Sequence, residues 1–274
     1  LYKGGLENIS YRDFMKKKFW RLLFPYLVFN LLFFIPKYLL AGFLNDKVDF
    51  SISYILGVLI RPRDNILGHT WFLVALFIIY SFAPLWNYCM KKNKKILWGS
   101  IIALGIVMYI FQIDTRVLSI KDLCNDTIFF IFGMLMAKVA VNKLNIGKIK
   151  FLIFFLIVVI FTALWEITNN QMIKLILCTC DLLILLLIPI VFNIKNEKIN
   201  ELGKYSYSIY IMHWPIMLTV RILLYQILHI NYLVVAVLML LSGFFAPLLI
   251  IKILNFIKKK YNVNSKYLYY LIGI

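Results

Sequence analysis

The sequence predicts an all-α protein, a polytopic bundle of about eight transmembrane helices. Two observations lead to this fold class. The chain has 274 residues, of which 63% are hydrophobic and only 15% are charged, whereas a soluble domain is about half apolar. The apolar residues also gather into long runs, and about 20 of them in a helix cross the hydrocarbon core. We therefore interpret residues 1–274 as one transmembrane domain.

The expected spans correspond directly to the apolar runs, which lie at 19–44, 71–89, 96–112, 123–141, 149–167, 171–193, 205–228 and 231–257. Pro25 and Pro36 are expected to kink or bound the first run, because proline lacks the backbone N–H. Thr70 precedes the second run and can cap its first turn. The apolar segment 51–60 is too short to span and is expected to be interfacial or re-entrant.

The basic residues give the orientation. A net charge of +18 would indicate nucleic-acid binding in a soluble protein, but here most lysines stand in short blocks between apolar runs, where membrane topology places them. With a cytoplasmic N-terminus and eight spans, 22 of the 30 basic residues face the cytoplasm. We therefore expect a multi-pass cell-membrane protein with both ends of this chain cytoplasmic. Lys92 and Lys259 should face inward, and His69 and Lys121 outward.

The four cysteines, Cys89, Cys124, Cys178 and Cys180, have no spacing typical of a zinc or haem site. Cys178 and Cys180 lie inside an apolar run, where packing or lipid contact explains them. The sequence predicts no metal.

The stretch "LGKYSYSIYIMHWPIM" (202–217) places polar side chains inside the seventh expected span. Ser206, Tyr210 and His213 have the spacing i, i+4, i+7 and share one helix face. Pro215 cannot donate to the carbonyl of Ile211, which adds an acceptor to this face. Two interpretations are open: His213 is satisfied by a neighbouring helix, or it lines a polar, substrate-facing cavity.

Two further charges lie within expected spans. Asp181 is central in the sixth and Arg221 lies in the outer half of the seventh. Consecutive helices are usually neighbours, so an ion pair between them is plausible, with either a structural or a catalytic role.

The stretch "FMKKKFWRLLFPY" carries cations at the cytoplasmic start of the first expected span. Lys17 and Lys18 stand four and three residues before Arg21 and share its helix face. They are either topology and lipid-headgroup signals or a clamp for a phosphorylated ligand. At the outer edge, His69 precedes Trp71, a residue type that suits the membrane interface.

Together these segments resemble the acyltransferase 3 family of integral membrane O-acyltransferases. The likeness covers nearly the whole chain and rests on "FMKKKFWRLLFPY", "GHTWFLVALFIIY" and "LGKYSYSIYIMHWPI", with "FFIFGMLMAK" as a weaker fourth block. The family usually has arginine at both positions of its basic pair, whereas this chain has Lys18 and Arg21.

The resemblance implies transfer of an acetyl or other short acyl group from cytoplasmic acyl-CoA, most simply acetyl-CoA, to a sugar hydroxyl of a surface polysaccharide or its lipid-linked precursor. It implies that Lys18 and Arg21 bind the CoA phosphates. Ser206, Tyr210, His213, His69 and Trp71 would line or orient the substrate path.

The family's catalytic histidine lies on its first helix, and the opening "LYKGG" resembles the segment directly after the family's second helix. The resemblance therefore implies that the chain corresponds to helices three to ten of a ten-helix enzyme. We expect it to be N-terminally incomplete and inactive alone, with no catalytic residue assigned within it.

Two other functions stay open. A transporter or exporter of a glycan or small metabolite could use the same polar path, although no pair of Gly- or Pro-broken helices recurs as an inverted repeat would require. A non-catalytic membrane module attached to another enzyme is the second alternative.

Overall fold

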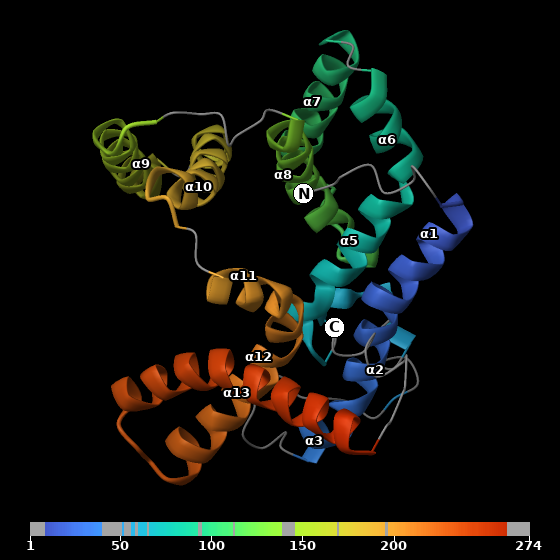
Figure 1. Ribbon diagram of the computed structural model, residues 1–274, viewed down its shortest axis with the longest axis vertical. Helices are drawn as coiled ribbons and strands as arrows, with labels where there is room; N and C mark the ends of the chain where they lie inside the picture. Colours follow the sequence, from blue (N-terminus) through green and yellow to red (C-terminus); the bar gives the residue numbers. More distant parts are fainter. Residues whose placement is uncertain are drawn as a thin grey trace. The chain divides into compact units, whose positions relative to one another are not determined.

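The computed structural model describes residues 9–39, 51, 56–57, 60–64, 66–92, 95–111, 113–138, 146–168, 170–194 and 197–261. Within these ranges every regular element is a helix (Figure 1), which confirms the all-α fold class. Most of the segment 51–60, expected to be interfacial or re-entrant, lies outside the described residues.

The helices divide into two compact units. The first unit comprises the described residues within 84–113 and 124–197. The second unit comprises those within 9–83, 114–123 and 198–274.

The first helical stretch of the second unit runs from Tyr11 to Leu39, so it begins before the expected Phe19. It comprises α1 (Tyr11–Lys18), a π-helical segment η1 (Phe19–Leu23), α2 (Phe24–Leu32) and α3 (Phe34–Leu39). Ser10 starts the stretch by accepting a hydrogen bond from the backbone N–H of Asp13 at 3.1 Å. This cap explains the earlier start.

Both prolines of this stretch coincide with irregular helix geometry, as expected. The π-helical segment ends at Leu23, two residues before Pro25, and α2 ends before Phe33, one turn ahead of Pro36. Without an N–H, Pro25 leaves the carbonyl of Arg21 without its helical donor.

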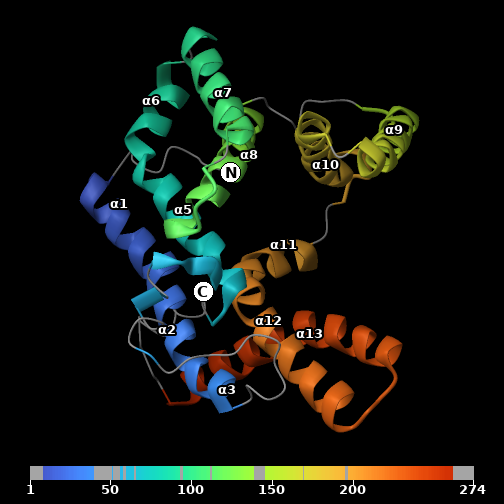
Figure 2. The same cartoon turned by 180° about the vertical axis from the view of Figure 1, so that it is seen from behind.

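The second unit continues with the short turn η4 (Gly68–Thr70) and α5 (Trp71–Ser81). Helix α6 (Ala83–Lys92) follows after Phe82 and belongs to the first unit from Pro84 on. The C-terminal part of the second unit is α11 (Glu197–Lys204), α12 (Ser206–Arg221), the π-helical segment η7 (Ile222–Ile227) and α13 (Tyr232–Tyr261). Helices α12 and α13 pack against each other (Figure 2). Gly243 permits this approach, because a Cβ there would lie 2.8 Å from Cγ of Met217.

The first unit packs α7 (Lys95–Ile110) on α8 (Ile120–Lys138), and α9 (Lys148–Thr168) on α10 (Gln171–Val191). Gly105 sits where α7 meets α8, and a Cβ there would lie 3.0 Å from the Cδ1 atoms of Ile128 and Ile131. Helices α9 and α10 bury Phe151, Val158, Leu177, Ile184 and Leu187 between them.

A helix lies in each of the eight expected ranges. Among the described residues, four helical stretches are long and apolar enough to cross a membrane: Tyr11–Leu39, Gln171–Val191, Ser206–Ile227 and Tyr232–Ile257. The interrupted pair of α5 and α6 makes a fifth if it is one span. Helix α8 falls outside this group because Lys121, Asp122 and Asp126 stand near its start.

Candidate active site

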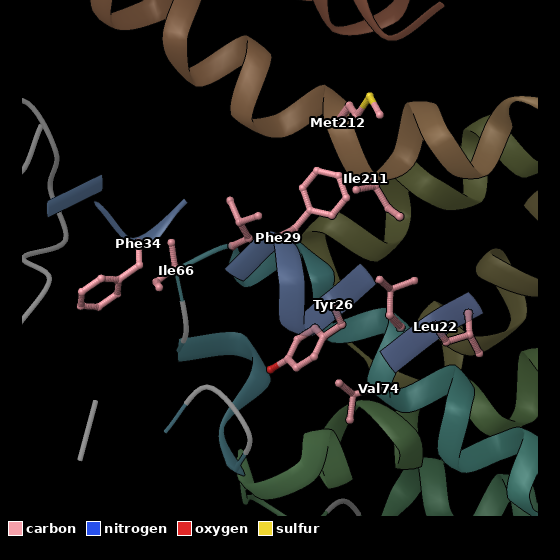
Figure 3. Packing of buried hydrophobic residues seen from close by; sticks show 10 residues of the cluster. Leu22, Tyr26, Phe29, Phe34, Ile66, Val74, Ile211 and Met212 are labelled. Atoms are coloured by element: carbon pink, nitrogen blue, oxygen red, sulfur yellow. The ribbon is translucent and has the colours of Figure 1, made fainter. Parts of the chain in front are cut away.

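The polar site of the second unit is built on apolar packing, in which α2 and the residues before α5 meet α12. The buried cluster there includes Tyr26, Phe29, Ile66, Leu67, Val74, Ile211 and Met212 (Figure 3). Three segments distant in sequence are thus held together around a small number of polar side chains.

Asn30 fixes the turn that carries His69. Its side chain is fully buried, and its Nδ2 donates to the carbonyl of Tyr26 at 2.7 Å and to Oγ1 of Thr70 at 3.2 Å. The backbone N–H of Leu67 donates to Oδ1 of Asn30 at 3.0 Å. Both ends of the Asn30 amide are satisfied, so the turn has one stable position on α2.

Two residues shape the same turn. Gly68 is required because a Cβ would lie 2.8 Å from the carbonyl oxygen of Arg63. The hydroxyl of Thr70 donates back to the carbonyl of Leu67 at 2.7 Å and makes no cap to α5. The expected capping role of Thr70 is therefore wrong, because its Oγ1 accepts from Nδ2 of Asn30 and not from a backbone N–H of α5.

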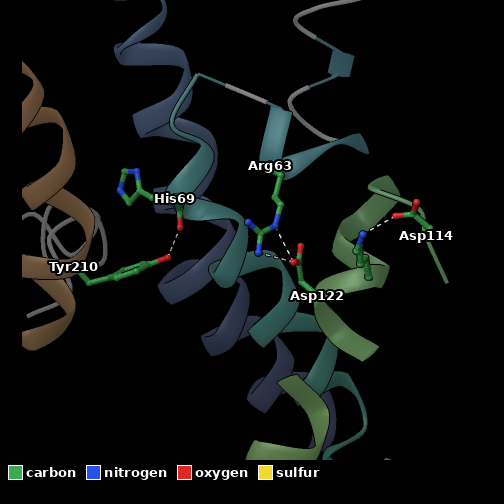
Figure 4. A network of polar contacts seen from close by, with 6 residues as sticks. Arg63, His69, Asp114, Asp122 and Tyr210 are labelled. Atoms are coloured by element: carbon green, nitrogen blue, oxygen red, sulfur yellow. Dashed lines mark hydrogen bonds and ion pairs between the residues drawn. The ribbon is translucent and has the colours of Figure 1, made fainter. Parts of the chain in front are cut away.

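Helix α12 is joined to this turn by two contacts. The hydroxyl of Tyr210 donates to the carbonyl of His69 at 2.5 Å (Figure 4). In return, Nε2 of His69 lies 3.4 Å from the carbonyl of Ile211, the acceptor that Pro215 leaves without a helical donor.

These contacts bring His69 and His213 together. Their ring centroids lie 5.3 Å apart with an interplanar angle of 77°. Nδ1 of His213 lies 2.7 Å from the carbonyl of Tyr210, and because a carbonyl only accepts, this contact requires the proton on Nδ1 of the neutral ring. Nε2 of His213 then carries the lone pair and can accept a hydrogen bond from a substrate.

The protonation of His69 is set in the same way. Its Nε2 faces the carbonyl of Ile211 and carries the proton, so Nδ1 holds the lone pair. That Nδ1 is buried and has no hydrogen-bond partner within the described ranges. A buried acceptor without a donor is costly, so this nitrogen is available to accept a hydrogen bond.

The structure separates Ser206 and Trp71 from the two histidines. Ser206 is exposed, and its hydroxyl donates to the carbonyl of Gly203 at 2.9 Å. The ring of Trp71 lies 4.3 Å from the guanidinium of Arg63. Arg63 also forms a 2.6 Å ion pair with Asp122, whose side chain is buried (Figure 4). Trp71 thus belongs to an ion-pair cluster beside the turn.

Two exposed ion pairs extend this cluster. Arg116 pairs with Asp64 and Lys121 pairs with Asp114, each at 2.7 Å. The hydrogen bond and the positive charge of Lys121 lower the pKa of Asp114. These contacts join the start of α8 to the segment before α5.

The expected cationic pair lies beside two tyrosines. Nζ of Lys18 is 3.7 Å from the ring centroid of Tyr80, and the exposed Arg21 has its guanidinium 5.8 Å from the ring of Tyr207. The hydroxyl of Tyr207 donates to the carbonyl of Arg21, the group that Pro25 leaves without a donor. Helix α12 is therefore attached to the cationic segment as well as to the histidine turn.

Tyr207, Tyr210 and His213 stand three residues apart along α12. At 1.5 Å per residue, about 9 Å of helix separates Tyr207, which contacts Arg21, from His213, whose ring faces that of His69. One face of α12 thus connects a site able to bind an anion with a site able to accept a hydrogen bond from a hydroxyl.

The ion pair between Asp181 and Arg221 stays a prediction, because the two residues belong to different units. Within their own units Asp181 is exposed and Arg221 is half-buried. Among the described residues, no group of three or more His, Cys, Asp and Glu side chains could hold a metal ion.

Sequence reasoning missed Asn30, Arg63, Asp122 and Trp214, and gave Tyr207 no role. Trp214 lies 6.2 Å from the ring of His69 and is 48% exposed. Asn30 was detectable as an amide inside an apolar run, where an unsatisfied polar group is expensive. Arg63 and Asp122 lie outside the apolar runs, where charged residues are ordinary, so nothing in the sequence singled them out.

Apolar spans surrounding a pair of histidines and a pair of cations define a multi-pass membrane protein with a polar site among its helices. A family model described as "Acyltransferase domain" matches residues 3–273, across both units. The chain belongs to the acyltransferase 3 family and is a membrane acyltransferase. Searches of curated proteins and of solved structures each gave no match.

Proposed function

We propose that the protein transfers an acetyl or other short acyl group from acyl-CoA to a sugar hydroxyl of a surface polysaccharide or its lipid-linked precursor. The observation that carries the proposal is the continuous face of α12 formed by Tyr207, Tyr210 and His213. Tyr207 contacts Arg21 at one end of this face, and His213 contacts His69 at the other.

Lys18 and Arg21 bind the phosphates of the donor in this proposal. Arg21 is exposed, so its guanidinium can form charge-assisted hydrogen bonds with phosphate oxygens. Lys18 contributes a point charge held over the Tyr80 ring. The thioester would then lie along Tyr207 and Tyr210, toward the histidines.

The acceptor hydroxyl is held by the histidine pair. The hydroxyl can donate a hydrogen bond to Nε2 of His213 or to Nδ1 of His69, because the backbone contacts leave the lone pairs of these two nitrogens available. The hydroxyl oxygen attacks the thioester carbonyl carbon, and the C–S bond breaks as the tetrahedral intermediate collapses. A general base, which the family resemblance places elsewhere, takes the hydroxyl proton and returns it to the sulfur, which leaves as CoA thiol.

We assign orientation of the acceptor, and not proton abstraction, to His213. Its Nδ1 is hydrogen-bonded to its own helix backbone, whereas a general base in a triad is usually stabilised by a carboxylate at that position. This assignment agrees with the family resemblance, which places the base elsewhere.

Eight spans with both ends of this chain cytoplasmic complete the proposal. The distribution of 22 of 30 basic residues supports this orientation. It places Lys18 and Arg21 on the cytoplasmic side, where acyl-CoA is available, and has the segment before α5 enter from the outer side, so that His69 reaches inward to His213.

Transfer of labelled acetyl groups from acetyl-CoA tests the function. Purified full-length protein should release CoA thiol only when a sugar acceptor is present, and the label should become covalently attached to that acceptor. A transporter would move the glycan across vesicles without releasing thiol, and a non-catalytic module would do neither. Either of the last two results contradicts the proposal.

A further inference from the structure

A second polar site lies between the end of α12 and the start of α13, away from the histidine pair. It is a cavity of about 610 Å³ lined by Met217, Arg221, Tyr225, Gln226, Tyr232 and Met239, among others. Gly243, where α13 approaches Met217, lies beyond its apolar end.

Arg221 is the feature of this cavity that calls for a ligand. Its Nε atom is buried, and in the part of the chain that the structure describes it has no hydrogen-bond partner. A guanidinium cannot lose its charge in a protein, and a buried N–H of that group without an acceptor is unfavourable. An anionic group bound beside Arg221 would remove that cost.

The cavity also has a polar end and an apolar end. Nearest the loop between the two helices stand Tyr225, Gln226 and Tyr232. The ring centroids of the two tyrosines lie 6.2 Å apart. Met217 precedes Arg221 by one helical turn and Met239 comes two turns after Tyr232, so both lie farther from the loop. Because α12 and α13 are antiparallel neighbours, the methionines mark the deeper, apolar end.

We infer that this cavity binds a membrane amphiphile with an anionic phosphate headgroup. The phosphate would accept hydrogen bonds from Arg221, and the two tyrosines would lie at headgroup level, where this residue type gathers in membrane proteins. An acyl chain would lie along Met217 and Met239, since methionine fills irregular apolar space. The inference is independent of the acyl-transfer proposal, because none of these residues is part of the site at His69 and His213.

Native mass spectrometry of the detergent-purified full chain tests the inference, with phosphatidylglycerol as probe and phosphatidylcholine as the zwitterionic comparison. The parent should retain phosphatidylglycerol in preference to phosphatidylcholine. Arg221→Gln should lower its occupancy by about ten-fold, as loss of one charge-assisted hydrogen bond predicts, while Arg221→Lys should keep part of it. The control is Lys174→Gln, which removes a cation on α10 outside the cavity and should leave the occupancy by phosphatidylglycerol unchanged.

Three results would overturn the inference. Equal occupancy in the parent and Arg221→Gln would show that lipid binds elsewhere. Displacement of phosphatidylglycerol by millimolar inorganic phosphate would show a site for a free anion and not for an amphiphile. Binding that is absent from the parent and gained in Asp181→Asn would show that Asp181 already neutralises Arg221. Thermal unfolding of each variant identifies any that fails to fold. If Arg221→Gln does not fold, the inference is tested by Arg221→Lys, which should keep part of the phosphatidylglycerol occupancy.

Discussion

Nε2 of His69 lies 3.4 Å from the carbonyl oxygen of Ile211, the one acceptor on this turn of α12 that Pro215 leaves without its helical donor. The contact links an irregular turn before α5 to an interrupted point of a second helix. It also sets the tautomer of His69, and so determines that Nδ1 is the nitrogen free for a ligand.

In the full-length protein, Arg21→Ala should weaken acyl-CoA binding by about 1.5–3 kcal/mol, as expected for a charge-assisted contact. Lys18→Ala should weaken it less, because lysine lacks the bidentate fork of arginine. Titration calorimetry with acetyl-CoA measures both, and Arg12→Ala, an exposed cation on the same helical stretch, is the control. If all three variants bind like the parent, the cations serve topology alone.

In the full-length protein, His213→Ala should lower turnover while leaving measurable activity, because the residue orients the acceptor and does not remove its proton. The Michaelis constant for the sugar acceptor should rise, and that for acetyl-CoA should change little. His229→Ala, in the loop before α13, controls for loss of a histidine outside the site. Complete loss of activity in well-folded His213→Ala would instead assign the base role to this residue.

Asn30→Ala should destabilise the protein by about 1–3 kcal/mol, because it leaves the buried N–H of Leu67 without its acceptor and removes a donor to the hydroxyl of Thr70. Thermal unfolding in detergent measures the loss. Turnover should fall as well, since the Asn30 amide holds the turn that carries His69. Asn87→Ala on α6 supplies a comparison outside this network, and an equal effect there would argue against a specific role for Asn30.

Cysteine accessibility in intact cells tests the eight-span orientation. Cysteines at positions 92 and 259 should react with an impermeant maleimide only after permeabilisation, whereas those at 69 and 121 should be accessible from outside. The expectation rests on the excess of basic residues in the proposed cytoplasmic loops. Labelling of position 92 from outside would refute the eight-span arrangement.

Helix positions were predictable because long apolar runs leave few alternatives to a helix in a membrane protein. The start of the helical stretch Tyr11–Leu39 could not be predicted in this way, because Ser10 caps a polar first turn that a hydropathy pattern does not detect. The face shared by Tyr210 and His213 was predictable from helical periodicity alone.

The contacts made by that face could not be derived in the same way. The approach of His69 to His213 depends on the amide of Asn30, the glycine at position 68 and the interruption at Pro215 acting together. Ser206 shares the periodicity of Tyr210, but its hydroxyl is used by the nearby carbonyl of Gly203 at the start of the helix. Spacing gives the direction of a side chain and does not say which competing partner it finds.

The two tyrosine hydroxyls on α12 have a mechanical consequence. Lipid gives packed helices little hydrophobic preference for one rotational setting over another. The Tyr207 and Tyr210 hydroxyls, bonded to the backbones of Arg21 and His69, are anchored at two heights along the helix axis. Rotation of α12 about its axis would break both hydrogen bonds, whereas with only one of them the helix could turn about that single contact. The two hydroxyl bonds thus help to fix the direction in which His213 points, and replacing both tyrosines with phenylalanine would leave the apolar packing of Ile211 and Met212 and the His69 contact as the remaining restraints.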